Sequence, residues 1–241
     1  MAELLRSGAV FIHVPKCGGT WVREALKRQG LWRDRVGYKH STAAHVNDVL
    51  RHHGWQFVKH WPRHPWVTPG ALRRAFKFCF IRDPLGWYES YWKYMAGQWH
   101  PWEMGRWHPQ RPIDGCGSDD FDEFVRKVLA KRPGYVSEMY GWYADGCDFV
   151  GRCERLVEDM ITALERAGER FDPEAIRTMP RVNVSESRRG APAWEPATLR
   201  RVIEAEAEGI ERWGYRAGAA RRLAAAGASD GVTPEGASPP G

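Results

Sequence analysis

Short β-prone runs alternate with amphipathic stretches along most of the chain. Residues 10–14 (VFIHV) form the first such run and end before Pro15, which is typical of a buried strand. In residues 20–29 the apolar positions recur at helical spacing, and Gly30 follows as a favourable helix end. The order strand, loop, helix is the opening half of a β-α-β unit.

The same alternation recurs downstream. It predicts strands at 56–59 and 77–82 and a further apolar run at 147–153. Helices are predicted at 45–53, from Thr68-Pro69, from Asp83-Pro84 to about residue 96, and at 118–131, 135–144, 154–167 and 196–213. Strands that alternate with helices indicate an α/β fold with a central, mostly parallel sheet flanked by helices.

Two segments lack this periodicity. Residues 97–117 combine Gly, Pro and three Trp, and we expect a long functional loop or lid there rather than a domain boundary. From residue 216 the chain is rich in Ala, Gly, Ser and Pro, which predicts a disordered tail over 216–241. Residues 1–215 are then expected to form a single domain.

The net charge alone decides little about the ligand. The 241 residues carry a net charge of 36 − 30 = +6, which suits an anionic ligand but also a soluble protein with an Arg-rich surface. No dense Lys/Arg tract interleaved with aromatic residues indicates DNA or RNA binding. The thirteen Trp residues are expected either in the core or on a surface that stacks against a sugar, and composition leaves both open.

The cysteines and the apolar runs indicate the cellular compartment of the protein. Five cysteines, an odd number without paired metal-ligand spacing, favour a reduced, cytoplasmic protein. No run reaches the roughly 20 apolar residues of a bilayer-spanning helix, and the first apolar run is too short for a secretory signal. We therefore expect a cytoplasmic protein without a membrane span.

The first chemical motif is FIHVPKCGGTW, residues 11–21. Gly18 and Gly19 can turn successive amides inward at a helix start, where an anion binds readily. Lys16 precedes the glycines, whereas the common nucleotide-binding loop has its lysine after them. Cys17 follows Lys16 where a magnesium-binding Ser/Thr is needed for ATP or GTP. A plain strand-to-helix turn and an NTP-dependent kinase remain alternatives.

The second motif is FCFIRDPLGWYESYW, residues 78–92. Arg82 ends a predicted strand, and Ser90 lies eight residues later inside the helix that follows. Both side chains can therefore converge on one anion. In the alternative interpretation, Arg82 pairs with Asp83 or a nearby acid and Ser90 is a packing residue.

The two motifs together resemble those of the PAPS-dependent sulfotransferases, in particular the carbohydrate (heparan-sulfate-like) type and its bacterial relatives; PAPS is 3′-phosphoadenosine 5′-phosphosulfate. VPKCGGTW resembles the loop for the 5′-phosphosulfate, with Cys17 where Thr or Ser is more usual, and IRDPLGWYES resembles the 3′-phosphate motif. Looser likenesses at 38–45, 148–160, 181–190 and 210–215 extend the resemblance over about residues 9–215. It implies a P-loop-like, three-layer α/β fold, PAPS as co-substrate and no required metal.

The resemblance also implies residue roles. Lys16 would stabilise the leaving phosphate, and the loop backbone with the Thr20 hydroxyl would bind the 5′-phosphate; the loop residues are Cys17, Gly18, Gly19, Thr20 and Trp21. Arg82 and Ser90 would bind the 3′-phosphate. Arg188 and Arg189 would close over it, or form a solvated charge cluster.

An acceptor hydroxyl needs a general base. His40 is the candidate because KHSTAAH resembles a His-containing segment of the family, with His60 and Glu89 as alternatives. His13 is expected in the core. The acceptor is expected to be a carbohydrate or a small metabolite, and a non-catalytic relative that binds a nucleotide or sugar is a further alternative.

Overall fold

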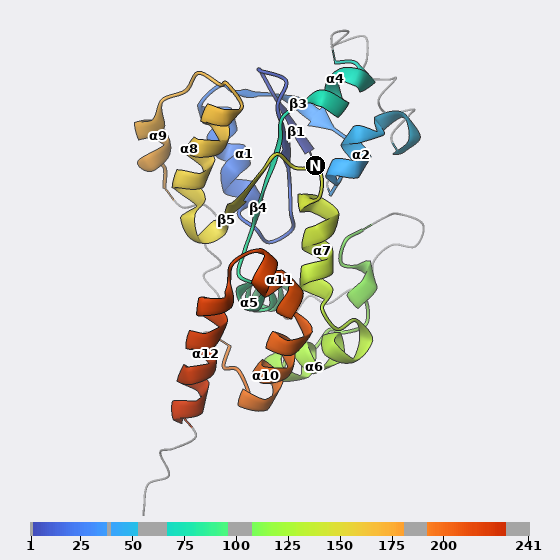
Figure 1. The fold of residues 1–241 in the computed structure, drawn as a ribbon, viewed down its shortest axis with the longest axis vertical. Helices are drawn as coiled ribbons and strands as arrows, with labels where there is room; N and C mark the ends of the chain where they lie inside the picture. Colours follow the sequence, from blue (N-terminus) through green and yellow to red (C-terminus); the bar gives the residue numbers. More distant parts are fainter. Residues whose placement is uncertain (1, 38–39, 53–66, 96–107, 181–191, 230–241) are drawn as a thin grey trace, which may run out of the picture.

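The computed structural model describes residues 2–37, 40–52, 67–95, 108–180 and 192–229 (Figure 1). Within these ranges, five strands form one sheet in the order β3-β1-β2-β4-β5. The strands are β1 (Ala2–Leu5), β2 (Val10–Ile12), β3 (Trp32–Val36), β4 (Lys77–Ile81) and β5 (Phe149–Arg152). The α/β class predicted from the sequence is confirmed.

The sheet is mixed rather than uniformly parallel. β2, β4 and β5 pair in parallel, whereas β1 is antiparallel to both of its neighbours, β2 and β3. Four strands therefore share one direction and β1 opposes them. The sequence pattern did not predict β1, which joins β2 through a tight turn in which Gly8 has φ +93°, a conformation that favours glycine.

Side chains of successive strand residues face opposite sides of the sheet. Phe11, Phe78 and Phe80 belong to one hydrophobic cluster, with α1 (Gly19–Arg28), α8 (Leu156–Arg166) and α9 (Pro173–Arg177). Val10, Ile12, Cys79 and Ile81 belong to the other, with α5 (Pro84–Met95), α6 (Phe121–Lys131), α7 (Tyr135–Ala144), α10 (Pro196–Ala205) and α11 (Ala207–Arg212). The sheet is thus a central layer between helices on both faces.

Most predicted helices are present, with shifted ends. The helix expected at 45–53 is represented by α2 (Ala43–Asn47), which begins earlier because Thr42 caps it. Thr68 caps α4 (Pro69–Arg74) as expected. The strand predicted at 56–59 and most of the loop at 97–117 lie outside the described residues.

The single helix predicted at 196–213 is two helices, α10 and α11, that meet at Glu206. The Glu206 side chain is fully buried. Its carboxylate accepts hydrogen bonds from the Tyr88 hydroxyl at 2.8 Å and the Ser137 amide at 2.7 Å. A buried carboxylate needs such partners, and they hold the chain at the helix break.

The disordered tail predicted from residue 216 is wrong for residues 216–229, which form α12 (Arg216–Ser229). Ala219, Leu223 and Ala226 of α12 pack on the core, at spacings that share one helix face. Alanine is the best helix former, so the Ala-rich composition suits a helix as well as a disordered tail. Among the described residues, no helix combines the length and apolar character needed to cross a membrane.

Candidate functional site

The loop between β2 and α1 carries the first motif. Gly18 precedes α1 with φ +74°, and Lys16 has φ +61°. Both residues therefore adopt the left-handed backbone region, which is uncommon for a lysine. The first amides of a helix have no acceptor within the helix, so the start of α1 presents N–H groups to this loop.

Position 19 requires glycine because the His13 ring lies too close for a Cβ atom, and not because of an unusual backbone angle. A Cβ atom at Gly19 would lie 2.1 Å from His13 Cδ2 and 2.2 Å from His13 Nε2. His13 is half-buried beside the loop, so its expected place within the core is only partly correct. The His13 ring packs against the start of α1 beside the loop of the first motif, and no pattern in the sequence indicates this contact.

Lys16 is placed among aromatic and cationic groups. Its Nζ lies 4.1 Å from the centre of the Tyr94 ring, a favourable cation–π distance. Burial and the nearby Arg82 guanidinium lower the pKa of Lys16 to about 8. Lys16 of the first motif and Arg82 of the second are therefore close enough for the charge of one to affect the protonation of the other.

The two motifs lie at the same edge of the sheet because β2 and β4 are adjacent and parallel. Ligands of α/β folds bind at this carboxyl edge. The Trp87 indole N–H of α5 donates a 3.1 Å hydrogen bond to the carbonyl of Pro15 in the loop. Trp87 is fully buried, so this bond connects the start of α5 rigidly to the first motif.

The second motif forms the end of β4 and the first turns of α5. The Asp83 carboxylate accepts from the Leu85 amide at 3.2 Å, which confirms Asp83 as the helix cap. Gly86 and Ser90 are four residues apart and share one face of α5, whereas Arg82 precedes the helix. A Cβ at Gly86 would lie 3.6 Å from Arg82 Cδ and 3.7 Å from Arg222 Nη2, so both arginine side chains pass beside Gly86.

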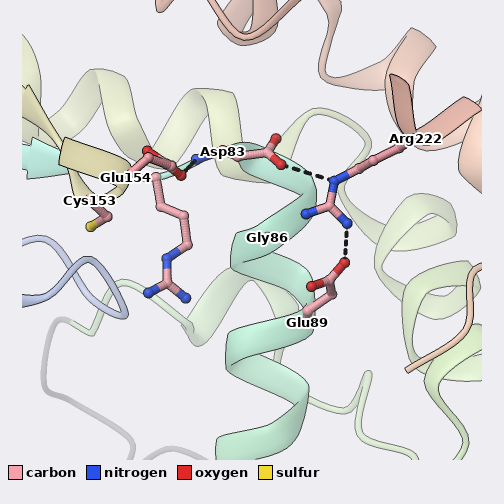
Figure 2. Close-up of a pocket in the computed structure, with 7 residues that line it drawn as sticks. Asp83, Gly86, Glu89, Cys153, Glu154 and Arg222 are labelled. Carbon is pink, nitrogen blue, oxygen red and sulfur yellow. Dashed lines mark hydrogen bonds and ion pairs between the residues drawn. The ribbon is translucent and has the colours of Figure 1, made fainter. Parts of the chain in front are cut away.

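A cavity of about 300 Å³ adjoins this motif (Figure 2). It is lined by Arg82, Asp83, Gly86, Glu89, Cys153, Glu154 and Arg222. Sequence reasoning did not find Arg222, which comes from α12 in the segment expected to be disordered.

Cys17 directs its side chain away from the loop surface. It is buried, and its thiol donates to the Tyr140 hydroxyl at 3.7 Å. A hydrogen bond with Cys17, together with burial, raises the pKa of the Cys153 thiol well above its usual value. Cys17 thus contributes a core contact, and only its backbone amide is available to a ligand of the loop.

Trp21 is buried, and its indole N–H donates to the Pro180 carbonyl at 3.2 Å. Thr20, one residue earlier, is exposed at the start of α1. The side chains of the first motif thus divide between the core and the surface, and Thr20 is on the surface side with the helix-start amides.

His40 lies among other imidazoles. Its ring centre is 5.9 Å from that of His13 and 5.0 Å from that of His108. His45, not His40, completes the capping box with Thr42. The His13 ring lies next to Gly19 and also next to the His40 ring. The sequence did not single out His108 among the nine histidines, because His13, His40 and His108 are far apart in the chain.

Two of the expected site residues and one alternative base belong to segments outside the described residues. These are Arg188, Arg189 and the alternative base His60. The other alternative base, Glu89, accepts from the Trp194 indole at 2.8 Å and pairs with Arg222, which favours a structural role.

Comparison with protein families adds one finding. A family model described as "Sulfotransferase family" matches residues 6–198, well over half of the chain and both motifs. No curated protein and no solved structure matches the chain.

Proposed function

The chain belongs to the sulfotransferase family, and we propose that it transfers the sulfuryl group of PAPS to an acceptor hydroxyl. Membership makes it a transferase. The observation that carries the PAPS proposal is the pairing of two anion-binding segments, around Lys16 and around Arg82, at one edge of the sheet. PAPS has anionic groups at both ends of its ribose, whereas ATP has no 3′-phosphate for the second segment.

In the proposed reaction the acceptor oxygen attacks sulfur, the bond from sulfur to the 5′-phosphate oxygen breaks, and a base takes the acceptor proton. Catalysis of such in-line transfers depends on positioning and on charge stabilisation. Lys16 would neutralise the charge that develops on the leaving phosphate oxygen. The amides of residues 17–21 and the Thr20 hydroxyl would hold that phosphate, as expected at a helix start.

Arg82 and Ser90 would bind the 3′-phosphate beside Gly86, in the cavity that Arg82 and Gly86 line. A guanidinium and a hydroxyl suit a phosphate because both donate charge-assisted hydrogen bonds to its anionic oxygens. Arg188 and Arg189 are proposed to close over the same group. The acceptor is proposed to be a carbohydrate or a small metabolite.

His40 is proposed as the base because its ring lies near His13, which contacts the loop at Gly19. We expect His40→Ala to lower kcat by roughly 10²-fold or more and to change the Kd of the product nucleotide little. The exposed His52, whose ring packs on His45, supplies the control His52→Ala. Loss of nucleotide affinity with an unchanged kcat would reject His40 as the base.

The pKa of Lys16 predicts a pH dependence of nucleotide binding. The unfolded chain protonates this amine with a pKa of 10.5 and the free folded protein with a pKa of about 8. Between these values the unfolded state binds more protons, so this group makes folding more favourable as pH rises. An anion beside Lys16 favours the protonated amine. Binding above pH 8 should therefore take up a proton, and affinity should fall by at most about tenfold per pH unit.

Calorimetry of 3′-phosphoadenosine 5′-phosphate (PAP) binding in buffers of different ionisation enthalpy measures this uptake. Lys16→Arg is the matched variant, since a guanidinium stays protonated throughout, and its affinity should be flat over the same range. Equal pH slopes for the two proteins would assign the proton to another group.

The function itself is tested by titration with PAP and with ATP, with and without magnesium. We expect PAP to bind more tightly and without magnesium, and labelled PAPS then to label a hydroxyl acceptor in a screen of glycans and metabolites. Tight, magnesium-dependent ATP binding that ignores the 3′-phosphate would instead indicate an NTP-dependent enzyme. PAP binding without transfer to any acceptor would favour a non-catalytic relative.

A further inference from the structure

The carboxyl-terminal part of the chain reaches the second motif through three polar side chains. Trp194 and Arg222 contact it directly, and Tyr215 reaches it through Glu154. Tyr215 and Arg222 lie beyond residue 198, where the family match ends, so the family model does not account for their contacts. Arg222 is the charged member of the three.

Arg222 joins two carboxylates on α5. Its Nε lies 3.2 Å from Asp83 Oδ2, and its Nη1 pairs with Glu89 Oε1 (Figure 2). Its Nη2 would lie 3.7 Å from a Cβ at Gly86. One guanidinium thus spans the first two turns of the helix, and a fork of fixed geometry is suited to such a bridge.

The two carboxylates are the chain neighbours of the proposed phosphate ligands. Asp83 follows Arg82, and Glu89 precedes Ser90. A bridge between Asp83 and Glu89 therefore constrains the backbone at both ends of the face on which the 3′-phosphate would lie.

Further hydrogen bonds hold both ends of this bridge. The Asp83 amide donates to Glu154 at 2.8 Å, and the Tyr215 hydroxyl donates to the same carboxylate at 3.0 Å. Glu89 accepts from the Trp194 indole at 2.8 Å. The contacts form one connected network between α12 and α5, and members of such networks depend on one another.

Partial burial strengthens the ion pairs. The side chains of Asp83, Glu89 and Arg222 are 14%, 22% and 34% exposed, so water screens them less than a surface pair. Without Arg222, three carboxylates would line the cavity with Arg82 as the remaining cation among its lining residues. Their mutual repulsion would then favour displacement of the Asp83 and Glu89 side chains, and with them the start of α5.

We propose that Arg222 is a positioning residue for the 3′-phosphate site: by bridging Asp83 and Glu89 it holds Arg82 and Ser90 at the separation that binds the phosphate. This inference rests on the proposed function. It assigns to α12, outside the family match, a part in recognition of the donor nucleotide.

The test compares two probes that differ only in the 3′-phosphate, PAP and adenosine 5′-phosphate (AMP). Wild type should bind PAP more tightly than AMP. Arg222→Ala should reduce that preference by roughly tenfold, the scale expected for a small misplacement of ligand groups, while the Kd for AMP stays within about twofold. With labelled PAPS, the KM for PAPS should rise and kcat at saturation should change little.

Arg221→Ala is the matched control, because Arg221 is the exposed neighbour on the same helix. It should keep the wild-type preference for PAP. Arg222→Lys keeps the positive charge but lacks the planar guanidinium, so it should retain part of the preference for PAP. If Arg222→Ala does not fold, Arg222→Lys takes its place in the test.

The outcomes separate the two proposals. A wild type that binds PAP and AMP equally would overturn the proposed function and this inference together. A wild-type preference for PAP that Arg222→Ala and Arg222→Lys leave intact would overturn the inference alone. Equal loss of affinity for PAP and AMP would also overturn it, because a general loss of structure affects both nucleotides alike.

Discussion

Lys16→Ala is expected to lower kcat for sulfuryl transfer by roughly 10²–10³-fold, the usual effect of removing one group that stabilises transition-state charge. The amine is half-buried near Arg82 and above the Tyr94 ring, so water cannot easily replace its charge. Charge builds on the leaving phosphate oxygen only as the bond to sulfur breaks. The loss should therefore appear in kcat more than in PAP affinity.

Single-turnover transfer from labelled PAPS measures this effect. Lys27→Ala is the control, since Lys27 is exposed on α1 and its Nζ lies 5.7 Å from the centre of the Trp32 ring. Its turnover should match wild type. If Lys16→Ala also turns over normally, Lys16 has no part in the chemistry and the proposed role is wrong.

Gly19→Ala is expected to destabilise the fold and to weaken nucleotide binding together. The new Cβ would meet the His13 ring at 2.1 Å, closer than any real contact. Either the ring or the first turn of α1 must move. Overpacking of this kind costs about 1–3 kcal/mol in the free energy of unfolding, and displacement of the helix start should weaken PAP binding by roughly tenfold or more.

Urea unfolding and PAP titration check both effects. Gly70→Ala is the control, because Gly70 also lies in the first turn of a helix but its Cβ would make only ordinary contacts, the nearest at 3.5 Å. Adding His13→Ala to Gly19→Ala should recover most of the lost stability. A double variant no more stable than Gly19→Ala would exclude the clash with His13 as the cause.

The two motifs of the candidate site could be located from the sequence because each is local; their proposed roles stay predictions. Lys16 to Trp21 and Arg82 to Ser90 each occupy one strand-to-helix connection, and local patterns indicate such connections well. Each motif follows a strand, and the carboxyl ends of parallel strands lie at the same edge of a sheet, so the two motifs were expected at one edge. The adjacency of β2 and β4, and the Trp87–Pro15 bond, depend on pairing across more than sixty residues and had no sequence signal.

The parts that sequence did not reveal are long-range or compositionally disguised. His13, His40 and His108 come from three separate segments. β1 was not predicted because its four residues, AELL, are too few to show a strand period, and its pairing partners lie on both sides. α12 was not predicted because its Ala- and Gly-rich sequence has few large apolar residues, although Leu223 and Arg222 anchor it.

The buried bond from Trp87 to the Pro15 carbonyl has a consequence for how a nucleotide is selected. It ties together the two connections that carry the proposed phosphate ligands, so their spacing is fixed in the protein without a bound nucleotide. Nucleotides would then be distinguished by the distance between their phosphates as much as by the identity of the base. In an isomer of the same charge with its second phosphate on the 2′ carbon of the ribose, the distance between the two phosphates would not match the distance between the two connections.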